Sequence, residues 1–274
     1  MDIQSHERYT NFTVETDPGE FSTLFEPLPT DLTELCTYVK RQFIHPSQTS
    51  QFRPALDPAM RDEDPLYDGV QDLLKELLAR HPEGLTLDRM PAERLIVSCR
   101  FHALLLASIL RYKNIPVRCR AGFARYLSER NDKYVDHWVC EVWSKELSRW
   151  IFVDPDQQIV DIPPDDFLTA GDAWLLCRSG EWNANVFGIK RSWGLGRIRT
   201  NLCLDLWNVL GTEPRYSDLP PICEVEMSRM KTHDLQMLDE LALLLQDVDY
   251  EWDNVRALAS AQPKLQVPSG RGGF

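Results

Sequence analysis

The feature that most constrains the fold is a change of hydrophobic period within residues 91–158. Residues 99–112 carry apolar side chains at helical spacing. Three following stretches, 117–127, 135–143 and 149–154, have the apolar composition of strands, and a short loop joins the last two. A buried helix followed directly by strands predicts an α+β fold, in which the helix packs on an antiparallel sheet.

Helical extensions are expected on both sides of this core. Apolar residues recur at helical spacing before it, where the Pro-, Gln- and Ser-rich segment 42–65 reads as a long loop, and again after it. The expected organisation has four parts: a helical N-terminal region with a long loop at 1–90, an α+β core at 91–160, a mainly helical extension packed on the core at 161–262, and a flexible tail at 263–274.

Composition narrows the class of protein. The net charge of −12 disfavours binding to nucleic acid or to anionic membranes. No apolar run approaches the roughly 20 residues that cross a bilayer, and the N-terminus lacks the pattern of a secretory signal, so a cytoplasmic location is expected. The seven cysteines are odd in number and irregularly spaced, which favours reduced thiols over a disulfide framework.

The two strands 135–143 and 149–154 predict a register. If residues 144–147 form a four-residue loop, Trp143 faces Ser148, and pairing back along the strands places His137 opposite Asp154. Directly opposed side chains have Cβ atoms about 4.5–5.5 Å apart, which suits an imidazole–carboxylate hydrogen bond. The expected register therefore gives His137 an orienting acid.

Cys99 is the candidate nucleophile. Ser98 reads as an N-cap, so Cys99 is expected to be the first residue of the helix. The positive end of the helix dipole favours thiolate over thiol, and the backbone N–H of Cys99 is expected to point at a developing oxyanion. Together with His137 on the sheet, these are the groups that acyl transfer through a thioester requires.

Three blocks of sequence, in the same order, resemble the transglutaminase-like superfamily. The first is Ser98-Cys99-Arg100-Phe101-His102-Ala103, followed by Leu110-Arg111-Tyr112-Lys113-Asn114-Ile115-Pro116-Val117-Arg118; the second is His137-Trp138-Val139-Cys140-Glu141-Val142; the third is Trp150-Ile151-Phe152-Val153-Asp154-Pro155. The resemblance implies a papain-like core with Cys99 as nucleophile, His137 as general base and acid, and Asp154 as the orienting residue.

The blocks depart from the family pattern at two places. Val97 and Ser98 stand where Gly commonly precedes the cysteine, which changes how closely a substrate backbone can approach Cys99. Asn114 replaces the usual Gly at the end of the helix, and Asn also adopts the left-handed conformation that this position needs.

The expected function is that of a cysteine-dependent acyl-transfer enzyme, acting on a peptide or small-molecule amide or acyl substrate. Hydrolysis is slightly favoured because water is always available. One alternative is an acyltransferase or transglutaminase that forms an amide with an amine; the candidates to line its amine subsite are Trp174, Trp182 and Trp193. A second alternative is a non-catalytic binding module. His102 is a candidate structural or supporting residue.

Neither a cofactor nor a metal is expected. No Gly-rich phosphate loop or EF-hand-like acidic loop is present. Zinc binding by His137 and Cys140 is disfavoured, because residues three apart on a strand point to opposite faces and the sequence has no Cys-x-x-Cys pair.

Overall fold

The computed structural model describes residues 4–57, 59–129 and 132–267, and these divide into two compact units. The first unit comprises residues 1–119 and 139–162, and the second comprises residues 120–138 and 163–274. Strands β3 (Val117–Ala124) and β4 (Tyr134–Ser144) each run from one unit into the other. Most of the tail expected at 263–274 lies outside the described residues, while 263–265 form a 3₁₀ turn.

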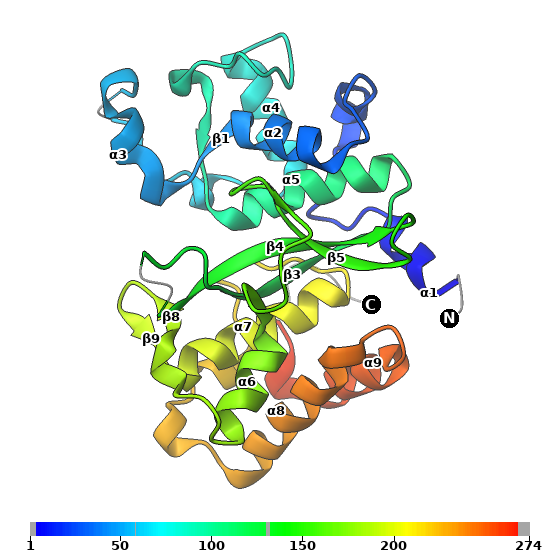
Figure 1. The fold of residues 1–274 in the computed structure, drawn as a ribbon, viewed down its shortest axis with the longest axis vertical. Coiled ribbons are helices and arrows are strands. Elements are labelled where there is room, and N and C mark those ends of the chain that lie inside the picture. Colours follow the sequence, from blue (N-terminus) through cyan, green and yellow to red (C-terminus); the bar gives the residue numbers. More distant parts are fainter. Residues whose placement is uncertain (1–3, 58, 130–131, 268–274) are drawn as a thin grey trace. The chain divides into compact units, whose positions relative to one another are not determined.

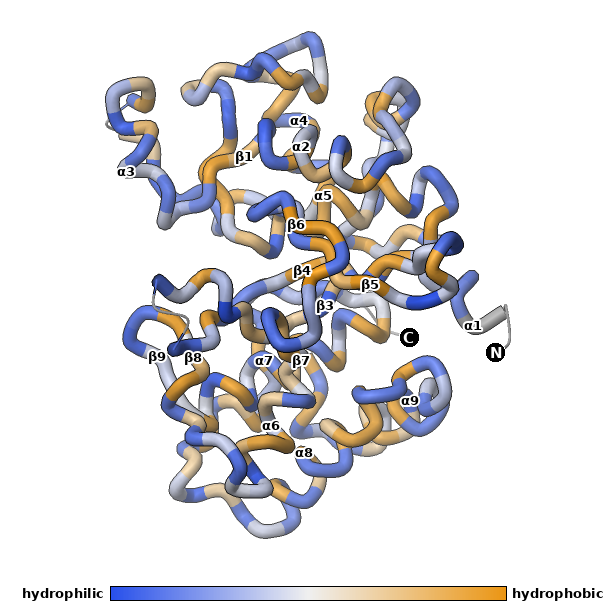
Figure 2. The backbone as a smooth tube through the Cα atoms, viewed as in Figure 1, coloured by the Kyte–Doolittle hydropathy of each residue, from blue (hydrophilic) through white to orange (hydrophobic). Residues whose placement is uncertain are grey.

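The first unit is built around one buried helix, α5 (Figure 1). Its elements are α1 (Gln4–Glu7), α2 (Leu32–Gln42), β1 (Phe43–Ile44), α3 (Thr49–Phe52), α4 (Val70–Arg80), β2 (Leu95–Ile96), α5 (Cys99–Tyr112), β5 (Arg149–Asp154) and β6 (Ile159–Val160). Hydrophobic colours run through α5 and along β4 and β5 (Figure 2). Helix α5 packs on the sheet within this unit, where the Cys140 thiol lies 3.3 Å from the Ala103 carbonyl oxygen. The α+β fold class, with a helix on an antiparallel sheet, is confirmed.

Single residues mark the start of α2 and the end of α5. Asp31 caps α2 by accepting a hydrogen bond from the Glu34 N–H, at 2.9 Å. Asn114 follows α5 with a φ of 56°, the left-handed conformation expected of it. The segment 42–65, expected to be one long loop, also contains short helical turns and β1, which pairs in parallel with β2.

The second unit packs helices on a second group of strands. Its elements are β7 (Phe167–Thr169), α6 (Ala170–Arg178), β8 (Phe187–Ile189), β9 (Ser192–Trp193), α7 (Leu195–Val209), α8 (Thr232–Leu244) and α9 (Trp252–Ala261). Strand β7 pairs antiparallel with the end of β3, and β8 pairs in parallel with the start of β4. Helix α6 packs against α7 and α8 (Figure 1).

A buried ion pair joins a strand to a helix in this unit. The Arg120 guanidinium on β3 donates two hydrogen bonds of 2.9 Å to the Asp205 carboxylate on α7, which also accepts the Ala121 N–H. Asp205 is completely buried, and its partners satisfy the charge that burial would otherwise penalise. The pair therefore fixes α7 against β3.

The register of β4 and β5 differs from the one expected. The loop occupies residues 145–148 rather than 144–147, so Ser144 pairs with Arg149 and Glu141 pairs with Phe152. Ser148 supplies the left-handed residue of the turn, with a φ of 51°. Each residue of β5 therefore faces a position two residues away from the predicted one, and the direct opposition of His137 and Asp154 was wrong.

Within the described residues, 4–57, 59–129 and 132–267, none of the helices combines the length and the apolar character that crossing a bilayer requires.

Candidate active site

Cys99 is the first residue of α5, as the sequence predicts, and its side chain is 5% exposed. The chain reaches this position through a segment fixed by two acidic residues. The Glu63 carboxylate accepts the Ile96 N–H at 2.9 Å, and the Asp64 carboxylate accepts the Ser98 N–H at 2.7 Å. Arg80 neutralises Glu63 at 2.5 Å. The start of α5 is thus held from outside the helix, and the Ser98 side chain makes no capping hydrogen bond.

His102 lies one turn along α5 and is completely buried. Its Nδ1 is 3.0 Å from the Ser98 carbonyl oxygen, and because a carbonyl only accepts, Nδ1 carries the proton. Its Nε2 lies 3.4 Å from Oδ1 of Asp156. Burial lowers the pKa of His102 to about 4, against the opposing attraction of Asp156. His102 is therefore a neutral, supporting histidine at physiological pH.

Asp154 ends β5 and organises the turn that follows. Its Oδ1 accepts hydrogen bonds from the Asp156 N–H at 2.8 Å and the Gln157 N–H at 3.0 Å. This is the arrangement of an Asx turn, in which a side chain replaces a backbone acceptor. Asp154 is fully buried, so the turn fixes the orientation of its carboxylate.

Asp156 is the polar residue of this region that sequence reasoning missed. Its carboxylate is 3% exposed and binds Lys40 of α2 at 2.5 Å, while Gln157 donates to the other oxygen at 2.9 Å. The only signal in the sequence was a second Asp two residues after Asp154. Lys40 is 116 residues away in the chain, so no local pattern could have linked the two.

His137 belongs to the second unit, whereas Cys99 and Asp154 belong to the first. It lies on β4, is 2% exposed, and meets the ring of Tyr126 edge-on, with 6.3 Å between the ring centroids. Its neighbour Asp136 points to the other face of β4, where Arg197 and Asn201 of α7 donate to the carboxylate.

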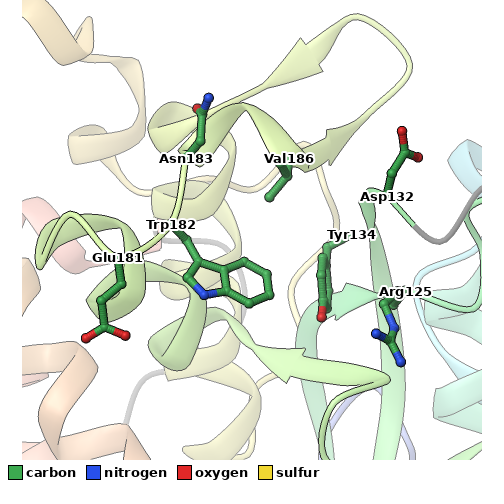
Figure 3. Close-up of a pocket in the computed structure, with 7 residues that line it drawn as sticks. All are labelled: Arg125, Asp132, Tyr134, Glu181, Trp182, Asn183 and Val186. Carbon is green, nitrogen blue, oxygen red and sulfur yellow. The ribbon is translucent and has the colours of Figure 1, made fainter.

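A cavity of about 370 Å³ lies entirely within the second unit. Figure 3 shows Trp182 and Tyr134 side by side in its lining, with Arg125 beside Tyr134, and the two rings meet edge-on with 5.3 Å between their centroids. Tyr134 and Asp136 are alternate residues of β4, so the cavity lies on the face of the strand opposite to His137. It is therefore not the pocket of that histidine.

The three tryptophans suggested for an amine subsite differ in burial. Trp174 is completely buried, and its indole N–H donates to Asp239 at 2.8 Å, so it is a core residue. Trp182 and Trp193 are 38% and 37% exposed. Among the residues that the structure describes, no group of three His, Cys, Asp or Glu side chains is arranged to hold a metal ion.

Comparison with known proteins adds one distant similarity. No protein-family model matches the sequence, and neither does any curated protein. Among solved structures, a candidate cysteine protease from Cytophaga hutchinsonii aligns with 62% of this chain at 14% identity and a TM-score of 0.37. The alignment spans 46% of that protein, which is less than half of its length. The candidate site is therefore argued from the residues of this chain alone.

Proposed function

We propose that the protein is a cysteine-nucleophile enzyme of the transglutaminase-like type, which acts on an amide or acyl substrate through a thioester. Cys99 is the nucleophile, His137 the general base and acid, and Asp154 the residue that orients His137. The observation that carries the proposal is the position of Cys99 as the first residue of α5, where the helix dipole favours the thiolate.

The corrected register remains compatible with this assignment. Continuing the pairing of Cys140 with Val153 by one residue brings Asp154 opposite Val139. Val139 and His137 are alternate residues of β4 and share a face of the strand. Asp154 is therefore proposed to act as a diagonal neighbour of His137 along the strand pair, rather than as a directly opposed one.

The proposed chemistry divides into acylation and deacylation. The Cys99 thiolate attacks the substrate carbonyl carbon, and His137 delivers a proton to the departing amine. Water then attacks the thioester with His137 as base, which releases a free acid and restores the thiol. An amine in place of water would give a new amide. Hydrolysis is favoured because it needs no second binding site.

Acyl transfer can be tested with p-nitrophenyl acetate as donor and hydroxylamine as a small amine. The wild-type protein should release nitrophenolate in a burst and carry an acetyl group on the Cys99 peptide by mass spectrometry. Cys99→Ser and His137→Ala should lose at least about 10³-fold in acylation rate. Cys177→Ser and His233→Asn serve as controls, because Cys177 lies in α6 and His233 is exposed.

The products separate the three functional classes. Free acid as the main product at every hydroxylamine concentration supports a hydrolase, whereas a saturable rise in acyl hydroxamate marks a transamidase with an amine site. If Cys99 is never acylated by this donor or by a panel of blocked peptide amides and esters, the enzyme proposal fails and the non-catalytic module takes its place.

A further inference from the structure

Two cysteines of the second unit contact each other outside the proposed site. Cys203 lies in the middle of α7 and is completely buried. Cys223 lies in the 3₁₀ helix η8 (Pro221–Glu224), which packs on α7, and is half-buried. Both are free thiols, and each sulfur lies near enough to change the acidity of the other. The pair therefore has one accessible member and one shielded member.

A buried arginine stands beside the accessible member. Arg199, one turn before Cys203 on α7, donates to the backbone carbonyl oxygens of Cys223 at 2.7 Å and Val225 at 2.5 Å. Its side chain is 5% exposed, and its Nε has no hydrogen-bond partner among the described residues. These contacts hold the Arg199 guanidinium against η8, and they leave its Nε–H without an acceptor. An anionic sulfur or sulfenate at Cys223 is the group that would satisfy it.

The surroundings shift the pKa values of the two thiols in opposite directions. The neighbouring Cys203 thiol, together with the charge of Arg199, lowers the pKa of Cys223 below its ordinary value. The neighbouring Cys223 sulfur and burial raise the pKa of Cys203 well above its ordinary value. Cys223 is thus the better thiolate of the pair.

Other cysteines lack this combination. Cys177 is also half-buried, but burial raises its pKa to about 11 and no cation opposes this. Cys119 and Cys140 form a second thiol pair, but both are completely buried, and burial is the main cause that raises the pKa of Cys140. Exposure, a thiol partner and a cation come together at Cys223.

We propose that Cys223 is a site of oxidation by peroxide and that Cys203 converts the oxidised sulfur into a disulfide. The proposal is independent of the function assigned to Cys99. It gives the chain a second thiol site, with hydrogen peroxide or an organic hydroperoxide as its reactant.

The reaction balances in two steps. The Cys223 thiolate attacks one peroxide oxygen, the S–O bond forms as the O–O bond breaks, and the leaving hydroxide takes a proton to become water. Sulfur is oxidised by two electrons and the peroxide is reduced. The Cys203 sulfur then attacks Cys223, the S–S bond forms, and the sulfenic oxygen leaves as water with the Cys203 proton. Two thiols and one hydrogen peroxide thus give one disulfide and two waters.

The test begins with the full-length wild-type protein, fully reduced, desalted and treated with hydrogen peroxide at neutral pH. Non-reducing digestion and mass spectrometry should find a Cys203–Cys223 linked peptide as the first disulfide formed, and a thiol reductant should remove it. Cys177 is the internal control and should stay reduced over the same time. Absence of the linked peptide, or oxidation of Cys177 at an equal rate, would overturn the proposal.

Variants separate the roles of the three residues. Cys203→Ser should stop the reaction at the sulfenic acid, so that dimedone labels Cys223 and no other cysteine of the second unit. Arg199→Gln should slow alkylation of Cys223 by iodoacetamide at pH 7 by about tenfold, because loss of the neighbouring cation reduces the thiolate fraction. Arg199→Lys, which keeps the charge, should lose less. Equal rates in all three proteins would contradict the role of Arg199.

Discussion

His102 directs the lone pair of its Nε2 at Oδ1 of Asp156 from 3.4 Å, and the same oxygen is bound by Lys40 at 2.5 Å. A neutral imidazole in this tautomer offers the carboxylate no proton, so Lys40 is the cation that stabilises the buried charge. The three residues connect α2, α5 and the turn after β5 within the first unit. The turn that carries Asp154 is therefore held by a charge network that extends to the helix bearing Cys99.

The first prediction concerns the stability of this network below neutral pH. The pKa of His102 is about 4 in the folded protein and about 6.5 in the unfolded chain, so the unfolded state binds more protons between these values. The stabilisation from keeping His102 neutral is fully present above pH 6.5. It is lost as the pH falls from 6.5 towards 4, by roughly 3 kcal/mol.

Urea unfolding at several pH values between 7.5 and 4.5 measures this loss. His102→Asn keeps an N–H donor for the Ser98 carbonyl but cannot gain a proton, so its stability should fall much less over the same range. His233→Asn, at an exposed histidine, should behave like the wild type. A His102→Asn curve parallel to that of the wild type would show that other groups cause the acid sensitivity.

The second prediction concerns Lys40. Lys40→Met should destabilise the protein by about 2–4 kcal/mol, because it removes a cation that pairs with the buried carboxylate of Asp156. Adding Asp156→Asn should recover part of the loss, since an amide at that position needs no counter-charge. Urea unfolding of the two single variants and the double variant gives the coupling energy. Additive losses would mean that the two side chains do not interact.

The third prediction compares two bidentate ion pairs that differ in burial. Asp205→Asn should cost about 3–5 kcal/mol, because Arg120, whose side chain is only 3% exposed, loses the charge of its buried carboxylate partner. Asp161→Asn, in the exposed pair with Arg149, should cost much less, because water screens both charges. The free energy of unfolding of each variant is measured in urea. Equal losses would mean that burial does not determine how much each ion pair contributes to the free energy of unfolding.

Local signals made much of the first unit predictable. The helical spacing of apolar residues, with Ser98 as the N-cap before them, located the start of α5 at Cys99. The composition of residues 149–154 located β5 at Arg149–Asp154. Both features depend on neighbours within a few residues, which a sequence displays directly. The fold class followed from the same reasoning, since a largely apolar helix must be covered by other elements.

The hairpin register was not determined by the same kind of signal. Loops at 144–147 and 145–148 have the same length, and they differ by a shift of two positions in the pairing. A shift of two leaves every side chain on its original face, so both registers give an equally coherent apolar layer. The observed register requires Ser148 to adopt the left-handed conformation. Serine rarely adopts that conformation, so its presence in the sequence does not predict it.

Contacts between distant residues were also invisible in the sequence. Lys40 and Asp156 meet only because α2 and the turn after β5 are brought together by the core. Cys203 and Cys223 meet only because η8 packs back on α7. Neither pair has a spacing that predicts contact, and the odd number of cysteines favours reduced thiols without indicating which of them lie close together.

The last prediction uses the two roles that Asp154 has in the proposed enzyme. Its Oδ1 accepts the N–H groups of Asp156 and Gln157, and an asparagine keeps this acceptor while losing the charge. Asp154→Asn should therefore fold with nearly wild-type stability. Asp154→Ala removes the acceptor as well, which leaves buried N–H groups unsatisfied and should cost about 1–3 kcal/mol.

Catalysis should respond differently from stability. An amide cannot stabilise the imidazolium that His137 becomes during acyl transfer, so Asp154→Asn should lose about 10³–10⁴-fold in kcat with p-nitrophenyl acetate, as should Asp154→Ala. Asp161→Asn is the matched control, because Asp161 is an exposed carboxylate of the same unit. Steady-state rates and urea unfolding are measured on the same preparations. Full activity in a well-folded Asp154→Asn protein would remove Asp154 from the proposed triad, since the loss of charge is the only change that this substitution makes to the carboxylate.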